Sequence, residues 1–201
     1  SILVKENKYY NTGLELLKNQ KFAAAAQQFR MVEQARNKPD GQTESNASLS
    51  LLKENSKFYL ALCALELGNS DAEVMFQQFI RDYPLNPNTI LAYFYVGASY
   101  FNQKNYPKAL EWFEKTDPTM LTKKQEMEFL FKQGYANFEL GNIDKAEDLF
   151  EKVKNQESSY TESATYYFAY INYLNKEYKT ALANFEKLNG SVTYQKTYPY
   201  Y

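Results

Sequence analysis

The chain has 201 residues and a formal net charge of −1, so it can bury a core but carries no excess of positive charge for nucleic acid or an anionic membrane. It has no histidine and one cysteine, Cys63, which excludes intrachain disulfides, His-assisted nucleophilic catalysis and most transition-metal sites. With seven Gly and six Pro and no apolar run of about 18 residues, it is expected to be helical, without a membrane span and without a cofactor.

One short unit, Ala-x-x-x-Phe, recurs along the chain. Successive alanines are 47, 37, 37 and 35 residues apart. Four residues are about one helical turn, so each pair lies on one face of a helix. In chain order the pairs are Ala25/Phe29, Ala72/Phe76, Ala109/Phe113, Ala146/Phe150 and Ala181/Phe185.

Each Ala-x-x-x-Phe unit is preceded by another helical stretch. That earlier stretch contains a small residue and is followed by a short polar turn. A small side chain lets the two helices approach closely, and the Phe fills the gap. The small residues are Gly13, Ala61, Gly97, Gly134 and Ala169, and the turns read NQK, GN, QKN, GN and NKE. This pattern predicts five helical hairpins. They span about residues 5–36, 48–83, 88–117, 122–156 and 159–189.

The segments between and after the hairpins carry three further expectations. Residues 37–47, "NKPDGQTESNA", read as a polar surface loop, and prolines such as Pro84 and Pro118 fall between hairpins. Residues 193–201 read as the start of a sixth hairpin, so we expect the parent protein to be longer. An uncovered end of this kind would favour self-association through the C-terminus.

The order of small residue, aromatic, turn, Ala-x-x-x-Phe and a further residue such as Val32, Phe79 or Val153 resembles the tetratricopeptide repeat (TPR) family. The resemblance implies an all-α fold, a right-handed α-α superhelix (solenoid) of about five TPR hairpins that spans residues 1–201 as one domain. It also implies a non-enzymatic protein-interaction role. The family's usual first-helix tyrosine is present only as Tyr100, and the period is slightly long.

A finer resemblance lies in residues 76–88, "FQQFIRDYPLNPN", which are similar to TPR proteins of the Gram-negative cell envelope, including outer-membrane assembly lipoproteins. Phrases such as "YFYVGASYF" and "ATYYFAYINYL" also resemble the first repeats of long periplasmic TPR proteins of gut anaerobes. Both imply a periplasmic or outer-membrane-associated protein.

In such a solenoid the first helices line the concave face. Residues three before, one after and four after each small residue should point inward. The partner-binding candidates are Phe94, Phe101, Phe131, Tyr135, Phe138, Tyr166, Tyr170 and Tyr173. The competing interpretation is that many of them, above all those three before the small residue, simply pack between helices.

In some members of the TPR family Lys and Asn at these inward positions hold the C-terminal carboxylate of a partner, and this chain has neither there. A protein or peptide partner would therefore be recognised by burial of an extended or helical apolar segment. A glycan-binding module that stacks sugars on tyrosine is the alternative. An enzyme is not expected, because no nucleophile and base can be assembled without histidine.

Overall fold

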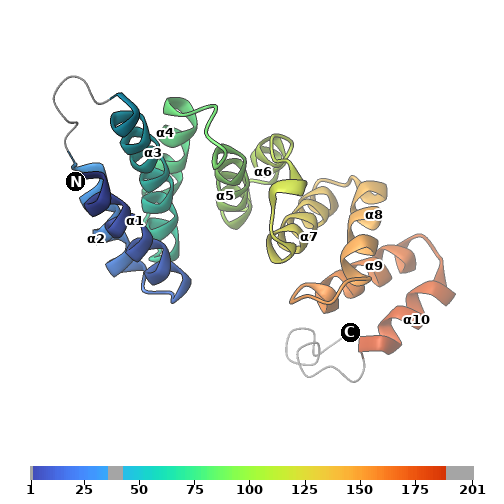
Figure 1. Cartoon of the computed structure of the whole chain (residues 1–201). Helices are drawn as coiled ribbons and strands as arrows, with labels where there is room; N and C mark the ends of the chain where they lie inside the picture. Colours follow the sequence, from blue (N-terminus) through green and yellow to red (C-terminus); the bar gives the residue numbers. More distant parts are fainter. Residues whose placement is uncertain (1, 36–42, 189–201) are drawn as a thin grey trace. The chain divides into compact units, whose positions relative to one another are not determined.

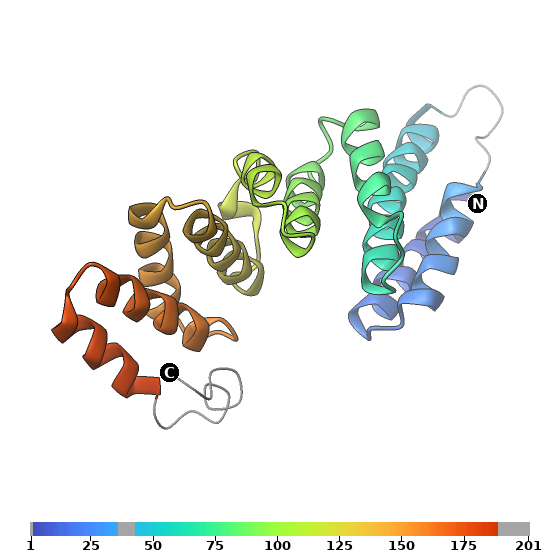
Figure 2. The same ribbon diagram turned by 180° about the vertical axis from the view of Figure 1, so that it is seen from behind.

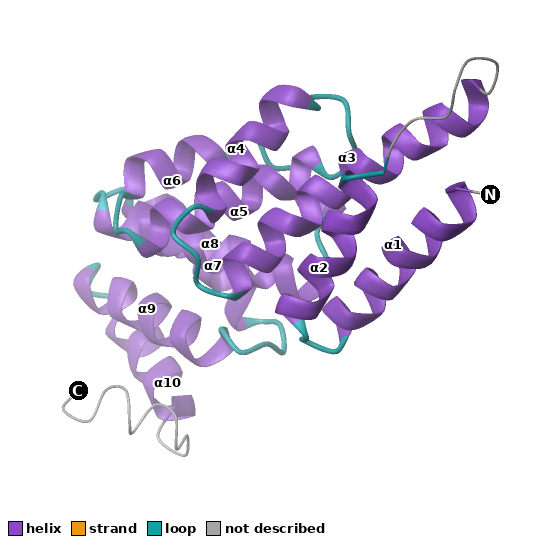
Figure 3. Cartoon of the chain, turned by 90° about the vertical axis from the view of Figure 1, so that its left-hand side faces the viewer, coloured by secondary structure: helices purple, strands orange, loops and turns teal. Residues whose placement is uncertain are grey.

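The computed structural model describes residues 2–35 and 43–188, and within them all regular structure is helical (Figures 1 and 3). This confirms the predicted all-α fold. The elements are α1 (Ile2–Lys18), α2 (Phe22–Glu33), α3 (Thr43–Glu66), α4 (Ala72–Asp82), α5 (Thr89–Asn102), α6 (Tyr106–Phe113), a short 3-10 helix η1 (Pro118–Met120), α7 (Lys123–Glu139), α8 (Ile143–Lys154), α9 (Thr161–Leu174) and α10 (Tyr178–Leu188).

The chain divides into two compact units, Ser1–Val96 and Gly97–Tyr201, with the boundary inside α5. In the first unit α1 packs on α2, α2 on α3 and α3 on α4. In the second unit α6 packs on α7, α7 on α8, α8 on α9 and α9 on α10 (Figure 1). Two second helices, α2 and α8, therefore pack against both the first helix of their own hairpin and the first helix that follows.

The predicted pairing of a small residue with a phenylalanine is confirmed in three hairpins. A methyl group added to Gly97 would lie 2.6 Å from the Phe113 ring, and one added to Gly134 would lie 3.0 Å from the Phe150 ring. Gly13 stands in the same relation to Phe29, at 2.8 Å. At Gly97 and Gly13 a side chain of any size would force the phenylalanine ring to move, whereas at Gly134 the ring would need to give only slightly.

Each hairpin turn contains one residue with a left-handed backbone, seven residues after the small residue. Two of these are glycines, but the other three carry side chains. The φ angles are 57° at Gln20, 72° at Gly68, 59° at Lys104, 79° at Gly141 and 66° at Lys176. In the third turn the Lys104 amide donates to the Phe101 carbonyl at 2.8 Å and the Asn105 amide to the Tyr100 carbonyl at 2.9 Å. This pair of bonds closes the first helix in the manner of a Schellman motif.

Neighbouring hairpins are joined by a ring stack that we did not predict. The repeat phenylalanine lies almost parallel to a tyrosine of the following first helix, two residues before that helix's small residue. The pairs are Phe29–Tyr59 (5.1 Å, 18°), Phe76–Tyr95 (5.2 Å, 17°) and Phe150–Tyr167 (5.2 Å, 18°). In α7 the corresponding residue is Lys132 instead of tyrosine.

The prediction of a polar loop over residues 37–47 is wrong for its last five residues, because α3 begins at Thr43. Leu49, two residues after this extension, is only 2% exposed, and α3 packs on α1 as well as α2. Tertiary packing thus holds in helix a stretch rich in Ser, Thr and Asn, which are weak helix formers. The predicted sixth hairpin, residues 193–201, lies outside the described residues.

The remaining sequence landmarks fall where they were expected. Pro84 lies between α4 and α5, and Pro118 opens η1 between α6 and α7. In the first turn of α6, the Asn105 side chain accepts a hydrogen bond from the Lys108 amide. Among the helices described, none combines the length and the apolar character needed to cross a bilayer.

Candidate functional site

Aromatic side chains of α5, α6, α7 and α9 form one connected cluster in the second unit, which we call the aromatic array. Its members are Phe101, Tyr106, Phe131, Tyr135, Phe138, Tyr166, Tyr167 and Tyr170. On α7 the spacing of Phe131, Tyr135 and Phe138 by four and three residues places the three rings on one helix face. The first helices of successive hairpins thereby present a continuous aromatic surface.

Tyr135 lies at the centre of the array. Its ring centroid is 5.7 Å from that of Phe101, 5.9 Å from Tyr106 and 5.2 Å from Tyr167. The last of these contacts is an edge-to-face arrangement at 88°, a favoured geometry for aromatic pairs. Three helices in addition to its own therefore fix the position of this ring.

The Tyr135 hydroxyl is held in a polar corner of this surface by Glu139. Burial, with a smaller contribution from the hydrogen bond to the Glu139 carboxylate, raises the pKa of Tyr135 to about 12. Burial also raises the pKa of Tyr106, and the charge of Glu139 adds to that effect. Both phenols remain neutral hydrogen-bonding groups at physiological pH.

The second polar feature of the array is a partly buried ion pair. Lys132 Nζ lies 2.7 Å from Glu128 Oε1, with side-chain exposures of 11% and 26%. The same ammonium sits 5.5 Å from the centroid of Phe101, in reach of a cation–π interaction. The Lys132–Glu128 ion pair therefore lies next to the Phe101 ring and adds charge to an otherwise mostly apolar surface.

The predicted binding residues are not all alike in exposure. Phe101, Phe131, Tyr135, Phe138 and Tyr170 are half-buried members of the array. Tyr166 belongs to it but is 6% exposed, and it lies parallel to Tyr170 at 6.2 Å. Tyr173 is 54% exposed and contacts Tyr178 of α10 at 5.8 Å.

Phe94 differs from the others, because it lies in the first unit with 1% of its surface exposed. It presents almost no surface to a partner. Phe58, at the corresponding position of α3, is equally buried at 1%. The position three residues before the small residue is therefore mainly an interior position.

Three functional candidates were missed in the sequence: Tyr106, Tyr167 and Lys132. A signal for two of them existed, since Tyr59, Tyr95 and Tyr167 all stand two residues before the small residue, and Lys132 occupies that place in α7. Tyr106 belongs to a second helix. It enters the array because α6 packs on α7, which no inward-facing rule for first helices predicts.

Outside the array, the cysteine and the carboxylates are the groups of the described chain that could react or bind a metal ion. Cys63 is fully buried, and burial raises the pKa of its thiol to about 11, so the reactive thiolate is disfavoured. Within residues 2–35 and 43–188 no group of three or more Cys, Asp and Glu side chains is arranged to hold a metal ion. Cys63 is therefore a packed thiol.

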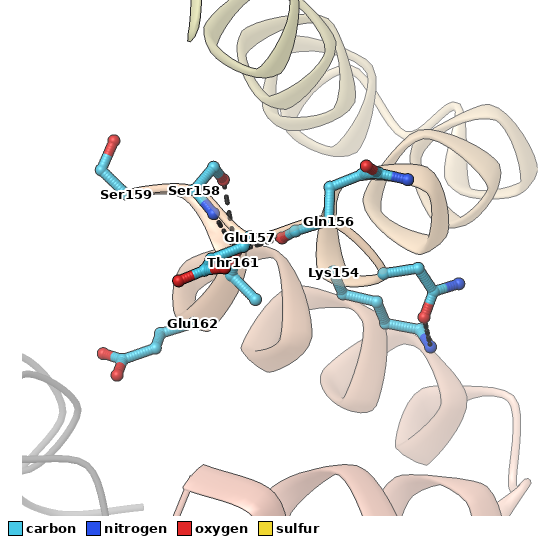
Figure 4. Close-up of a pocket in the computed structure, with 8 residues that line it drawn as sticks. Lys154, Gln156, Glu157, Ser158, Ser159, Thr161 and Glu162 are labelled. Carbon is cyan, nitrogen blue, oxygen red and sulfur yellow. Dashed lines mark hydrogen bonds between the residues drawn. The ribbon is translucent and has the colours of Figure 1, made fainter. Parts of the chain in front are cut away.

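An open polar pocket of about 730 Å³ lies beside the loop between α8 and α9 (Figure 4). The Thr161 hydroxyl group that lines this pocket forms hydrogen bonds within the loop itself. The Ser158 amide donates to Thr161 Oγ1 at 2.9 Å, and the Thr161 hydroxyl donates to the Gln156 carbonyl. Ser159 and Glu162 point outward in Figure 4. These bonds fix the loop that precedes α9, and they do not assemble a nucleophile with a base.

The comparisons with known proteins agree with this architecture. Residues 56–86 and 128–158, which fall in the second and fourth hairpins, match the family model of the tetratricopeptide repeat. The fold is that of the tetratricopeptide repeat. The two matched segments overlap the predicted repeats 48–83 and 122–156. A search of curated proteins finds no relative that matches the chain.

Solved structures with the same TPR fold cover nearly the whole chain. MamA from strain AMB-1 aligns with a TM-score of 0.64 and 17% identity, over 98% of this chain and 99% of that chain. MamA from Desulfovibrio magneticus RS-1 gives 0.62 and 17%, over 92% and 93%. A kinesin light chain-like TPR protein of Podospora anserina gives 0.60 and 13%, over 100% and 99%. At these identities the likeness concerns the fold.

Proposed function

We propose that this chain is a non-enzymatic scaffold that binds an apolar peptide or helix of a partner protein over the aromatic array. The repeat matches support the general class, because TPR domains serve as protein-interaction modules. The observation that carries the specific surface is the connected set of half-buried rings around Tyr135. Half-exposed aromatic side chains lose little entropy on binding and bury a large area.

The polar groups of the array give this surface orientation as well as apolar area. Glu139 and the two phenols beside it, Tyr106 and Tyr135, offer hydrogen-bonding groups at one side. The Lys132–Glu128 pair satisfies its own charges at 2.7 Å. A partner segment with an apolar stripe and a few polar groups fits this arrangement better than a highly charged one.

The test is a binding screen with apolar peptides, followed by the double variant Tyr135→Ala with Tyr170→Ala. We expect it to weaken a captured peptide at least tenfold while far-ultraviolet circular dichroism stays unchanged. Tyr100→Ala, which removes a ring of α5 outside the array, is the matched control. Unchanged affinity in the double variant, or a collapse of its melting temperature, would contradict the proposal.

A glycan-binding module is the second candidate. The hydroxyls of Tyr106 and Tyr135 beside Glu139, next to ring faces, favour it, because sugars are recognised by stacking together with hydrogen bonds. Oligosaccharides in the same screen decide between the two classes. Binding of sugars alone would replace the peptide proposal.

We also propose a periplasmic or outer-membrane-associated location and a role in cell-envelope assembly. Support for both comes from the resemblance of residues 76–88 to envelope TPR proteins. Fractionation of the source cells with an antibody against this chain tests the location. Recovery in the cytoplasmic fraction would contradict it.

A further inference from the structure

A groove of about 370 Å³ lies on the first unit where side chains of α2, α3 and α4 meet, and we call it the α4 groove. α3 packs on both α2 and α4, and Figure 2 shows α4 lying along α3. The groove lies between the first and second hairpins, so it is not an end face of the row of hairpins. Its volume falls in the range of ligand-binding clefts, about 300 to 1,000 Å³.

The floor of the α4 groove is apolar. Leu60 of α3 and Phe79 of α4 line it and are 7% and 2% exposed. Met75 packs against the buried cluster that contains Leu60. Val74, also in the lining, is 62% exposed. A partner that covers Val74 and Met75 would therefore remove apolar surface from water.

The same groove is lined by three carboxylates and one ammonium group. The carboxylates belong to Glu33, Asp71 and Asp82, which are exposed. The ammonium of Lys57 lies 5.3 Å from the centroid of the Tyr83 ring. A hydrogen bond with Tyr83 raises the pKa of Lys57, and the charges of Glu33 and Asp82 act in the same direction. Lys57 is thus already engaged, and the lining keeps an excess of negative charge.

Four lining residues follow one another at intervals of four, three and four, which places them on one face of α4. They are Asp71, Met75, Gln78 and Asp82. Gln78 donates hydrogen bonds to both carboxylate oxygens of Asp82, at 3.0 and 2.9 Å. Eleven residues span about 16 Å of helix. Carboxylates therefore mark both ends of a stripe with apolar surface between them.

The second unit contains a groove at the corresponding place, among α6, α7 and α8, with a volume of about 450 Å³. It is lined by two carboxylates and two lysines, so its charges balance. Lys145 stands at the place of Asp71, and Gln133 stands at the place of Leu60. The acidic rim over an apolar floor is therefore a property of the α4 groove and does not follow from the repeat itself.

We propose that the α4 groove binds a basic amphipathic α-helix of a partner protein, with two arginine or lysine side chains about three turns apart and apolar side chains between them. Along α4, its apolar side chains would cover Val74 and Met75. Its cations would reach Asp71 at one end and Asp82 at the other. Charge complementarity favours this occupant over an acidic or neutral helix. The groove shares no residue with the aromatic array, so the inference does not rest on the function proposed above.

The experiment titrates the full chain into a fluorescently labelled helical peptide of about 12 residues. The peptide has arginine at both ends, leucines between them on the same face and alanine elsewhere. We expect saturable binding in anisotropy, weakened at least tenfold when Asp71→Asn and Asp82→Asn are combined. The melting curve should stay unchanged, because both side chains are exposed and Asp71 makes no capping hydrogen bond. Added salt should also weaken binding.

Asp148→Asn is the matched control, since it removes a carboxylate from the corresponding groove of the second unit, and it should leave binding unchanged. A peptide with glutamine in place of the leucines should bind at least tenfold more weakly. Equal binding by that peptide would reduce the groove to a general acidic surface and overturn the proposal. So would absence of binding, or unchanged affinity in the Asp71→Asn, Asp82→Asn variant. Binding that only Tyr135→Ala with Tyr170→Ala abolishes would assign the peptide to the aromatic array instead.

Discussion

The ring of Phe150 lies between the helices of its own hairpin and the hairpin that follows, beside Gly134 on one side and 5.2 Å from the ring of Tyr167 on the other. One residue therefore stabilises two interfaces at once. We therefore expect the Phe150 side chain to contribute more to the free energy of unfolding than most other side chains of its hairpin.

Phe150→Ala should lower the free energy of unfolding by about 3 to 5 kcal/mol, because a fully buried ring is replaced by a cavity. Phe113→Ala should cost a similar amount, since Phe113 is also 1% exposed and packs against Gly97. Urea denaturation followed by circular dichroism measures both. An unaltered denaturation midpoint for Phe150→Ala would contradict this packing.

Gly97 and Gly134 should respond differently to replacement by alanine. An added methyl would lie 2.6 Å from a Phe113 ring atom at Gly97 but 3.0 Å from a Phe150 ring atom at Gly134. Overpacking costs about 1 to 3 kcal/mol, whereas alanine gains about 1 kcal/mol of helix propensity over glycine. Gly97→Ala should therefore destabilise and Gly134→Ala should be nearly neutral. Equal effects of the two changes would argue against this difference in clearance.

Lys132→Ala should destabilise the second unit by about 1 to 3 kcal/mol, because it leaves Glu128 poorly solvated without its partner. Adding Glu128→Ala should recover part of the loss. A double-mutant cycle with thermal or urea unfolding measures the coupling. Strict additivity of the two single changes would mean that the 2.7 Å ion pair contributes nothing.

Alkaline pH should lower the free energy of unfolding, because two half-buried tyrosines, Tyr10 and Tyr135, resist ionisation in the folded state. Burial raises the pKa of Tyr10 and of Tyr135 to about 12, from about 10 in an unfolded chain. The neutral phenols thus contribute stability that is fully present below pH 10 and is lost between pH 10 and about 12. Tyr10→Phe and Tyr135→Phe should each make this decline shallower in urea titrations. Identical slopes for the variants and the unaltered protein would contradict the assignment.

The hairpins could be predicted from the sequence because their determinants are local and repeated. A glycine such as Gly134 and a phenylalanine such as Phe150 recur at constant spacing, and the structure brings them into contact. The early start of α3 was not predictable in this way. Its first residues are weak helix formers, and packing that buries Leu49 holds them in the helix.

The candidate site was predictable only in part, for a geometric reason. A rule for inward-facing positions finds the half-buried rings of Phe101, Tyr135 and Tyr170, but it treats each first helix alone. Tyr167 and Tyr106 join the array through contacts between successive hairpins, at 5.2 Å and 5.9 Å from Tyr135. Such contacts depend on how helices stack, and sequence spacing within one helix does not encode them.

The left-handed residue of each turn, from Gln20 to Lys176, lies at a constant seven residues after the small residue, whereas the segments between hairpins differ in length. An insertion inside a hairpin would shift the helix crossing away from its phenylalanine, and an insertion after Asp82 or Phe113 would leave every crossing in register. The chain can therefore be recombined in whole hairpins. Residues 84–88 and 114–122 are therefore the places for grafted loops or binding epitopes, because the segments that join hairpins in this chain already differ in length.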